Sequence, residues 1–377
     1  MKPEPDALRQ ILNPPPLFPP LFPAGLIRGA VEDFEVEELP AYFPEGTGEH
    51  SYLWIEKRGL SAGDLISRLA RTLRISPQDI GFAGQKDRHA VTRQFVSVPR
   101  RCAACPVQLA ASDIRVLAVS AHRNKLRTGH LKGNRFRIIV RHPDAHWTDA
   151  DARQISERLR QISQSGFPSY FGTQRFGHAG STLRDGIALL QGQLSRRRWP
   201  FQRQRMMTRL VLSAVQSAAF NLVVSARVSG GTVGRPVAGD VVIRKDGTRP
   251  FLLLAGPMPG LLPAGPMPGP GMLATTGSVA AAEAVALEQL GLSGEEFRRY
   301  ARLCGGTRRP MLAFPADCSA ERTPEGHLRI DCELGGGTYV TVLLREIFAS
   351  LVDAAAVGPE QPDEEQEEGE RQKRKYQ

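Results

Sequence analysis

Apolar and polar residues repeat along this chain with the spacings of both strands and helices. Residues 52–55 are apolar at every position, which is typical of a strand covered on both faces. A helix is expected next, because the following apolar residues share one helical face and because Ser61 and Asp64 have the spacing of a capping box. Pro77 should end this helix.

The same pattern predicts three further strands and a polar loop between two of them. Short apolar stretches indicate strands around residues 80–82 and 95–98, and the segment 84–92 between them is polar. Residues 134–141 alternate between apolar residues on one side and mainly arginines on the other, as in a half-buried strand. Asp87 is therefore expected at the middle of a loop that connects two strands.

The middle of the chain differs in composition from its flanks. From about residue 162 it is rich in Gly and Phe, then in Arg, and then an Ala/Val/Leu helix is predicted near 210–228. Gly-Pro-Met-Pro-Gly occurs twice within residues 256–271, and its prolines predict a loop. Strand character returns at 328–334. We expect an α+β fold in which one domain is interrupted by a second.

The two ends of the chain are predicted to be disordered. Residues 1–24 hold eight prolines and should form an extended arm, and residues 356–377 carry many charges and almost no apolar residues. This tail has seven acids and four bases, so the net charge of +10 leaves residues 1–355 at about 10 + 3 = +13. Such a basic body indicates a polyanionic partner or a solvated, arginine-rich surface.

Several classes of protein find no support in the sequence. No run of about eighteen apolar residues and no signal peptide occurs, so we expect a cytoplasmic protein without a membrane contact. Five cysteines do not describe a disulfide framework, and Cys102 and Cys105 lack a second pair with zinc spacing, which favours structural thiols over a metal site. Motifs for nucleotide hydrolysis, Rossmann cofactors and the commonest hydrolases are missing, so any chemistry rests on side chains alone.

The loop around Asp87 is the sharpest local candidate for chemistry. Lys86 and Arg88 flank the carboxylate, and nearby positive charge favours the ionised form that a nucleophile or base requires. The local sequence alone is at least as well explained by a structural role, in which Asp87 makes a turn and a surface ion pair.

Two basic regions could contact nucleic acid. Residues 121–141 contain seven Lys or Arg and no acid, with Phe136 among them, and they could neutralise phosphates or simply form an exposed strand face. Six arginines between 196 and 209 lie beside Trp199 and Phe201. Two separated basic regions fit a long folded RNA better than a small anion.

Residues 82–94, which include Asp87, resemble the signature of the TruD family of tRNA pseudouridine synthases. Further segments resemble family motifs in the family's order, namely Asp33–Glu38, Gly46–His50, Arg123–Gly129, Gly133–Phe136, Tyr170–Gly177 and Gly337–Glu346. The likeness spans about residues 25–350. Ser169 departs from the family's usual Asn at that place, and the doubled Gly-Pro-Met-Pro-Gly is a second departure.

The resemblance implies a fold and a domain order. A pseudouridine synthase catalytic domain with a curved mixed or antiparallel sheet is expected from residues 25–161 and 309–355. The family's own α/β domain, the TRUD domain, is expected as an insertion at 162–308. The arm 1–24 and the tail 356–377 lie outside both.

The resemblance also implies residue roles. Asp87 would be the catalytic aspartate, and Phe34, Asn134, Phe136 and Tyr339 would line the uridine pocket, with Asn134 holding the Asp87 loop. Lys86 and Arg88 would keep Asp87 ionised or touch phosphate. The residues expected to bind RNA are Arg123, Lys125, Arg127, Lys132 and Arg175.

The activity implied is that of an isomerase, an intramolecular transferase that converts uridine to pseudouridine in tRNA. Position 13 in the D arm is the expected target, and a monomer without a cofactor, metal or protein partner is expected. The residues leave open whether Asp87 attacks the ribose, adds to the uracil or removes a sugar proton. Two alternatives remain, a synthase acting on another RNA and a non-catalytic RNA-binding or chaperone protein with the same fold.

Overall fold

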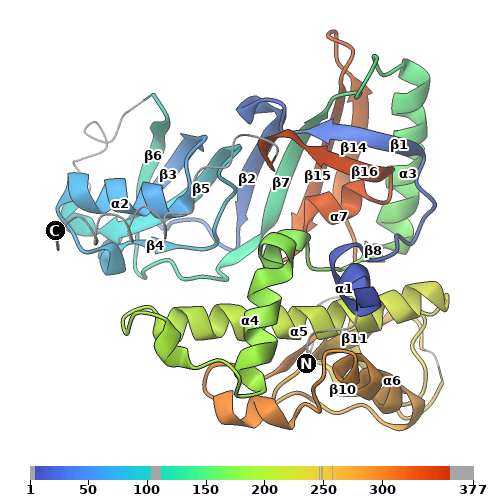
Figure 1. Cartoon of the computed structure of the whole chain (residues 1–377). Coiled ribbons are helices and arrows are strands. Elements are labelled where there is room, and N and C mark those ends of the chain that lie inside the picture. Colours follow the sequence, from blue (N-terminus) through green and yellow to red (C-terminus); the bar gives the residue numbers. More distant parts are fainter. Residues whose placement is uncertain (1–4, 103–111, 246, 248, 257, 357–377) are drawn as a thin grey trace, which may run out of the picture.

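The computed structural model describes residues 5–102, 112–245, 247, 249–256 and 258–356, and Figure 1 shows an upper group of elements around a large sheet and a lower group around a long helix. The large sheet has eight strands in the order β14-β15-β7-β2-β5-β3-β6, with β4 paired to β5. Within this sheet only the β2–β5 pair is parallel. The strands are β2 (Phe34–Pro40), β3 (His50–Arg58), β4 (Gly81–Phe82), β5 (Val91–Pro99), β6 (Ile114–His122), β7 (Leu131–Val140), β14 (Ala316–Arg322) and β15 (Leu328–Gly335).

Helices and a small parallel pair of strands cover this sheet. Ser61 caps α2 (Ala62–Leu73), as predicted, by accepting from Asp64 N, and Thr148 caps α3 (Asp149–Ser165) in a capping box with Asp151. The helix α7 (Val340–Leu344) leads to β16 (Phe348–Asp353), which pairs with β1 (Phe22–Ile27). The sheet thus combines strands from both ends of the chain with helices, and the expected α+β class is confirmed.

The lower group consists of the elements between α3 and β14. They are β8 (Phe167–Pro168), α4 (Ser181–Leu190), α5 (Gln204–Ser229), β9 (Val241–Arg244), β10 (Phe251–Leu252), β11 (Leu261–Met267), α6 (Gly277–Glu288), β12 (Thr307–Pro310) and β13 (Leu312–Ala313). Four of them form a sheet in the order β10-β9-β11-β12, and β8 pairs with β13. The domain boundaries at 162 and 308 stay a prediction, and β12 lies across the second of them.

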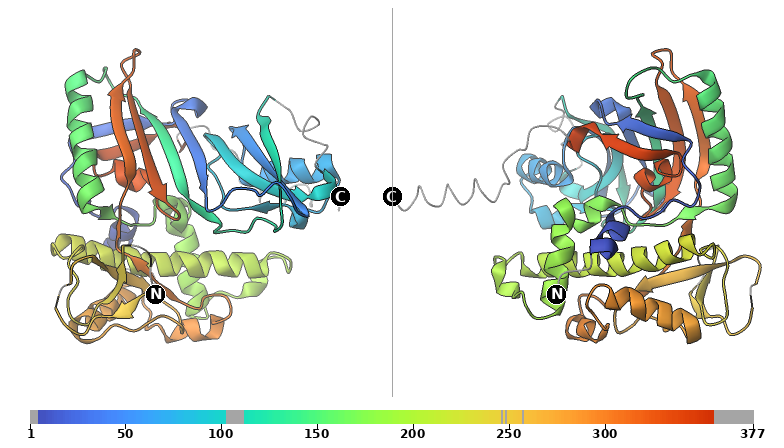
Figure 2. Two further views of the ribbon diagram at one scale, coloured as in Figure 1. Left: turned by 180° about the vertical axis from the view of Figure 1, so that it is seen from behind. Right: turned by 45° about the vertical axis from the view of Figure 1, so that its right-hand side comes forward.

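Helix α5 lies at the centre of the lower group (Figures 1 and 2). By length and composition it is the one described helix that could cross a membrane, but most of its apolar stretch is packed inside the protein. Val211, Val215 and Phe220 are among its fully buried residues. The helix is thus a core element of the fold.

The prediction of a loop throughout 256–271 was wrong for residues 261–267. These residues form β11, a fully buried strand that pairs with both β9 and β12 although it contains Pro263 and Pro266. Proline removes a backbone donor but keeps its carbonyl, and Pro263 O accepts a hydrogen bond from Met311 N at 2.9 Å. Burial of the whole strand outweighs the missing donors.

The N-terminal arm is not disordered over its described part. Pro5–Leu12 form α1, in which Ala7 and Ile11 are buried in the main core, and Asn221 Nδ2 donates to Ile11 O at 3.1 Å. The prediction of disorder was wrong because it relied on the proline content. The apolar pair Ala7 and Ile11, spaced i, i+4, is sufficient to dock a short helix on α5. The predicted disordered tail, beyond Ala356, lies outside the described residues.

A buried carboxylate holds the arm beside α7. Glu346 is 1% exposed, and its Oε2 accepts hydrogen bonds from Leu17 N and Phe18 N, both at 2.8 Å. Burial raises the pKa of Glu346 to about 7, against the lowering influence of the two N–H groups and of Arg345 and Arg158.

The stabilising contribution of Glu346 is expected to fall as the pH rises. Since its folded pKa lies above the ordinary 4.5, the folded state binds the proton more tightly, and the contribution is complete below pH 4.5 and lost as the pH rises through about 7. Relative to Glu346→Gln, the free energy of unfolding of the wild type should fall by about 3 kcal/mol between pH 4.5 and 8. Urea unfolding at both pH values measures this, and a difference that is constant or widens toward pH 8 would contradict it.

Candidate active site

The loop that carries Asp87 is fastened to the sheet through its backbone. Lys57 on β3 is fully buried, and its Nζ donates to Asp87 O at 2.7 Å and to Leu60 O at 2.6 Å. Burial lowers the pKa of Lys57 to about 8, while the nearby Asp87 acts in the opposite direction. A buried amine therefore fixes the position of the loop and leaves the Asp87 side chain free to point elsewhere.

Arg28 binds the carboxylate of Asp87. Its Nη2 donates to Asp87 Oδ1 at 3.2 Å, and its Nη1 donates to Asp353 Oδ2 at 2.5 Å. The Arg28 side chain is 6% exposed, whereas that of Asp87 is 34% exposed. Arg28 also has a φ of 56°, a left-handed conformation that is uncommon for a residue with a Cβ and that recurs at functional sites. The guanidinium is thus a buried support beneath an accessible carboxylate.

Two phenylalanines lie next to this ion pair. The guanidinium carbon of Arg28 lies 4.0 Å from the centroid of the Phe34 ring, and Phe34 meets Phe136 edge to face at 6.3 Å. The register of β2 and β7 puts both rings on one face of the sheet, where they are 1% and 5% exposed. The structure brings these predicted pocket residues together with Asp87 through Arg28, as the floor of the site.

Lys86 is buried in an ion pair. Its Nζ donates to Glu38 Oε2 at 3.1 Å, and the two side chains are 4% and 1% exposed. Burial raises the pKa of Glu38, and Lys86 partly offsets this. A contact of Lys86 with the substrate stays a prediction, while in this structure the Glu38 carboxylate on β2 holds its amine out of solvent. Lys86 clamps the loop to the far end of β2.

Asn134 and Tyr339 lie near the same end of the sheet. Asn134 is opposite Glu38 in the register, and its Oδ1 is buried without a hydrogen-bond partner among the described residues. Its expected bond to the Asp87 loop is therefore not made by this oxygen. The ring of Tyr339 packs against Phe171 at 6.1 Å, and Arg309 fixes the preceding turn by donating to Gly337 O at 2.9 Å.

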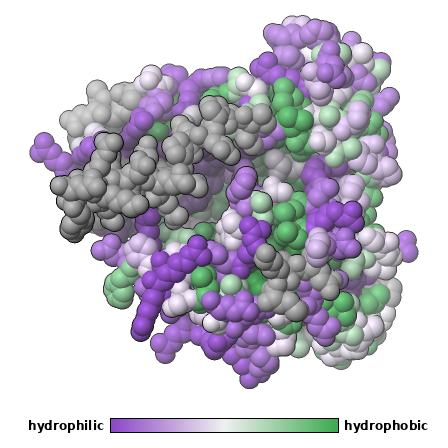
Figure 3. All heavy atoms as spheres, viewed as in Figure 1, coloured by the Kyte–Doolittle hydropathy of each residue, from purple (hydrophilic) through white to green (hydrophobic). Residues whose placement is uncertain are grey.

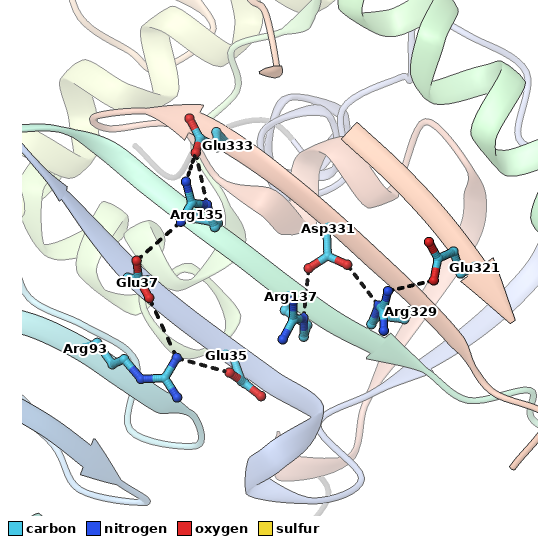
Figure 4. Close-up of polar contacts among 9 residues, drawn as sticks. All are labelled: Glu35, Glu37, Arg93, Arg135, Arg137, Glu321, Arg329, Asp331 and Glu333. Atoms are coloured by element: carbon cyan, nitrogen blue, oxygen red, sulfur yellow. Dashed lines mark hydrogen bonds and ion pairs between the residues drawn. The ribbon is translucent and has the colours of Figure 1, made fainter. Parts of the chain in front are cut away.

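The opposite face of the sheet carries charges that neutralise one another. Arg135 donates to Glu333 at 2.6 Å and to Glu37 at 3.4 Å, and Arg137 donates to Asp331 at 2.9 Å. We call this ladder the open face; it consists of Glu35, Glu37, Arg93, Arg135, Arg137, Glu321, Arg329, Asp331 and Glu333 (Figure 4). Arg135 and Arg137, which belong to the basic region 121–141, are thus paired with carboxylates of the protein itself.

The residues expected to bind RNA differ in their surroundings. Arg123 is exposed but pairs with Glu45 at 2.8 Å, and Lys125 donates to Gln78 O. Arg175 is half-buried and donates to the hydroxyls of Ser217, at 3.2 Å, and Ser213. Among the cations predicted to contact RNA or substrate, Arg88, Arg127 and Lys132 are exposed and make no ion pair with any described residue.

Arg28 and Lys57 were missed by the reasoning from sequence. Arg28 lies 59 residues before Asp87, next to a strand, and Lys57 lies within an apolar strand. The one available clue for Lys57 is a charge two residues after the apolar stretch 52–55, which predicts a strand covered on both faces. Among the described residues, no group of three or more His, Cys, Asp or Glu is placed to hold a metal, and Cys105 lies outside them.

The activity that the resemblance implies offers a test of this support: replacing Arg28 should slow catalysis more than it weakens RNA binding. Arg28→Met removes the donor to Asp87 Oδ1, and a misplaced catalytic group typically costs about 10²-fold in rate. Single-turnover rates and dissociation constants for tRNA measure the two effects, and Arg28→Lys should recover part of the rate because it restores a donor. Arg68→Met, which removes an exposed pair with Asp113, is the control. Equal rates for Arg28→Met and the control would refute the positioning role.

Comparisons with known proteins match one family along most of the chain. The family model described as "tRNA pseudouridine synthase D (TruD)" matches residues 23–197 and 202–347. A protein of that name from Anaeromyxobacter dehalogenans (strain 2CP-C) is 40% identical over 330 residues, which cover 86% of this chain and 92% of the relative. One from Thermus thermophilus is 36% identical over 334 residues, 86% of this chain and 88% of the relative.

A solved structure supports the fold. The crystal structure described as that of a "Putative tRNA pseudouridine synthase D (TruD)" from Methanosarcina mazei has a TM-score of 0.68 and 22% identity, and the match covers 92% of this chain and 98% of that one. The family model that matches most of the chain and the 40% identical relative show that the chain belongs to the TruD family of tRNA pseudouridine synthases.

Proposed function

We propose that this enzyme isomerises uridine to pseudouridine in tRNA, with Asp87 as the catalytic carboxylate. The observation that carries the proposal is the one-third-exposed carboxylate of Asp87, fixed through Lys57 and Arg28 above the Phe34–Phe136 floor. The names of the relatives supply the reaction and the class of RNA. A carboxylate beside a floor of aromatic rings suits a single everted nucleoside better than double-helical RNA.

The reaction breaks the bond from ribose C1′ to uracil N1, turns the base and joins C1′ to C5. A proton leaves C5 and one is gained at N1, so no atom is lost overall and no oxidant or group donor is required. The hydrogen bond from Arg28 occupies Oδ1 of Asp87, which leaves the other oxygen available toward C1′, C6 or a sugar proton. Arg28 keeps the carboxylate in place through each of these routes.

The target nucleotide must leave its stack before it can reach Asp87, at a cost of about a few kcal/mol. The buried, unpaired Oδ1 of Asn134 is an acceptor of the kind that the N3–H of an everted uracil satisfies. Burial of an unpaired acceptor costs about 1–3 kcal/mol, which a bound base would recover. Asn134 would thus read the base rather than hold the loop.

The proposed target is uridine 13 in the D arm, and a transcript tests it. Wild-type protein incubated with unmodified tRNA should yield pseudouridine at position 13, mapped by carbodiimide-dependent primer extension, while a transcript with cytidine at position 13 should yield none. If pseudouridine formed only at another position, the target would be that uridine and not uridine 13. Tight binding without any pseudouridine would favour the non-catalytic RNA-binding alternative.

A further inference from the structure

The segment around the start of α5 carries a positive charge that carboxylates of the protein compensate only at Arg198 among the described residues. From residue 186 to residue 239 the chain has eight arginines and no Asp or Glu, and six of the arginines lie between 196 and 209. All six are exposed: Arg196, Arg197, Arg198, Arg203, Arg205 and Arg209. In Figure 3 hydrophilic residues gather on the lower part of the molecule, over the region of this segment in Figure 1. This concentration sets the segment apart from the rest of the surface.

These arginines differ from those of the open face. There, each arginine is paired with one or more carboxylates of neighbouring strands. Here only Arg198 has such a partner, Asp185 at 3.2 Å, and the other five make no ion pair with any described residue. Mutual repulsion of unpaired charges costs stability, so a polyanion is the complement this surface lacks.

The helix itself adds to the positive field. The N-terminus of α5 has no acidic residue in its first turn and no side-chain cap, and Arg203 occupies the N-cap position. A helix N-terminus carries about half a positive charge, which acids there normally offset. Arginines at this end act with the helix dipole to attract phosphate.

An exposed aromatic ring lies within the cluster. Trp199 is buried in the core and anchors the turn, while Phe201, two residues later, is 88% exposed. The turn that contains Phe201 is closed by hydrogen bonds from Arg203 N and Gln204 N to Pro200 O, at 2.8 and 3.1 Å. A ring presented on a rigid turn among cations has the composition of a platform on which an unpaired base stacks.

The cluster lies on the same side of the molecule as the catalytic loop. In the views of Figures 1 and 2, the N-terminal part of α5 extends beneath the part of the large sheet that contains β3, β5 and β6. Asp87 lies in the loop before β5, and the exposed Arg127 lies in the loop after β6. An RNA long enough to reach both would contact both groups of elements.

We propose that the Pro200–Arg203 turn and the start of α5 form a second docking site for the substrate RNA. Phe201 stacks on an unpaired base outside the target nucleotide, and the unpaired arginines contact the phosphates beside it. This inference rests on the proposed function, because the occupant it names is the tRNA that is modified at Asp87.

Binding of unmodified tRNA transcript to the full-length protein tests the site. Phe201→Ala should weaken binding about tenfold, which is a typical loss for one base–aromatic stack, and Phe201→Trp should restore it. The double variant Arg203→Ala/Arg205→Ala should reduce the slope of log K against log salt by about two. Fluorescence anisotropy at four salt concentrations measures both effects.

Matched controls separate this site from general effects. Leu254→Ala removes another exposed apolar residue of the lower group, 82% exposed, and Arg160→Ala removes an exposed arginine paired with Glu157; both should bind tRNA as the wild type does. Unchanged affinity of Phe201→Ala, or a loss equal to that of Leu254→Ala, would overturn the proposal. The proposal would also be overturned if Phe201→Ala and the double variant lost binding to phosphatidylserine vesicles but kept the wild-type affinity for tRNA, since the patch would then fit a membrane. Pseudouridine formation by the wild type, followed in parallel, reports on the proposed function separately.

Discussion

Asp87→Asn is expected to reduce pseudouridine formation by about 10⁴-fold or more, which is the scale of loss when a catalytic nucleophile or base is removed. The amide has the same size as the carboxylate but lacks its charge and its basic oxygen. Release of tritium from tRNA labelled at uracil C5, with enzyme in excess, measures the rate of the chemical step. All three routes open to Asp87 require the carboxylate, so the expectation does not depend on choosing among them.

The same substitution should leave the RNA affinity and the fold almost unchanged. The Asp87 side chain is one-third exposed and the buried Arg28 keeps its ion pair with Asp353, so loss of the charge should cost only about 1 kcal/mol of stability. The dissociation constant for tRNA should stay within about threefold of the wild-type value, because the phosphate contacts that dominate affinity lie elsewhere. If Asp87→Asn bound tRNA poorly and were inactive for that reason alone, the result would not support a catalytic role. If it modified tRNA at near the wild-type rate, Asp87 would not be the catalytic residue.

Lys86→Met is expected to destabilise the protein by about 3–5 kcal/mol, because it leaves the Glu38 carboxylate buried without its cation. Burial already raises the pKa of Glu38, so the penalty is largest at a pH where Glu38 must be ionised. Urea unfolding at pH 8 measures it. Activity should fall as well, because the loop that carries Asp87 loses the clamp at the far end of β2.

The double variant Lys86→Met/Glu38→Leu distinguishes a buried ion pair from a general packing role. Removing both charges should recover most of the lost stability, since replacing a whole buried pair by apolar residues is often neutral. Phe95 N, which donates to Glu38 at 3.4 Å, would still lose its acceptor, so full recovery is not expected. If the double variant were as unstable as the sum of the two single variants, the ion pair would not be the source of the effect.

Local sequence signals predicted the elements that depend on local physics. The capping residue Ser61 starts its helix as expected, and the polar segment between β4 and β5 is the loop that carries Asp87. Alternation along β7 put Phe136 on the buried face and Arg137 on the opposite one. In each case the deciding interactions lie within a few residues or within one strand.

Predictions failed where distant segments decide the outcome. The partners of Lys86 and Asp87, which are Glu38 and Arg28, lie 48 and 59 residues away, and a flanking lysine alone cannot show whether it faces solvent or a buried acid. The arm docks because Ile11 finds the surface of α5, with Asn221 210 residues later, and Pro263 fits a strand because its neighbours bury it. Strand pairing and tertiary burial override local propensity at these places.

The central claim is that this protein converts uridine to pseudouridine with the carboxylate of Asp87 and without an added cofactor. Nucleoside analysis of an unmodified tRNA transcript, after incubation with purified wild-type protein or Asp87→Asn in buffer with a chelator, tests it most directly. One pseudouridine per tRNA with the wild type and none with Asp87→Asn is the expected result. Equal pseudouridine yields from the two proteins, or none from the wild type on any tRNA, would contradict the claim.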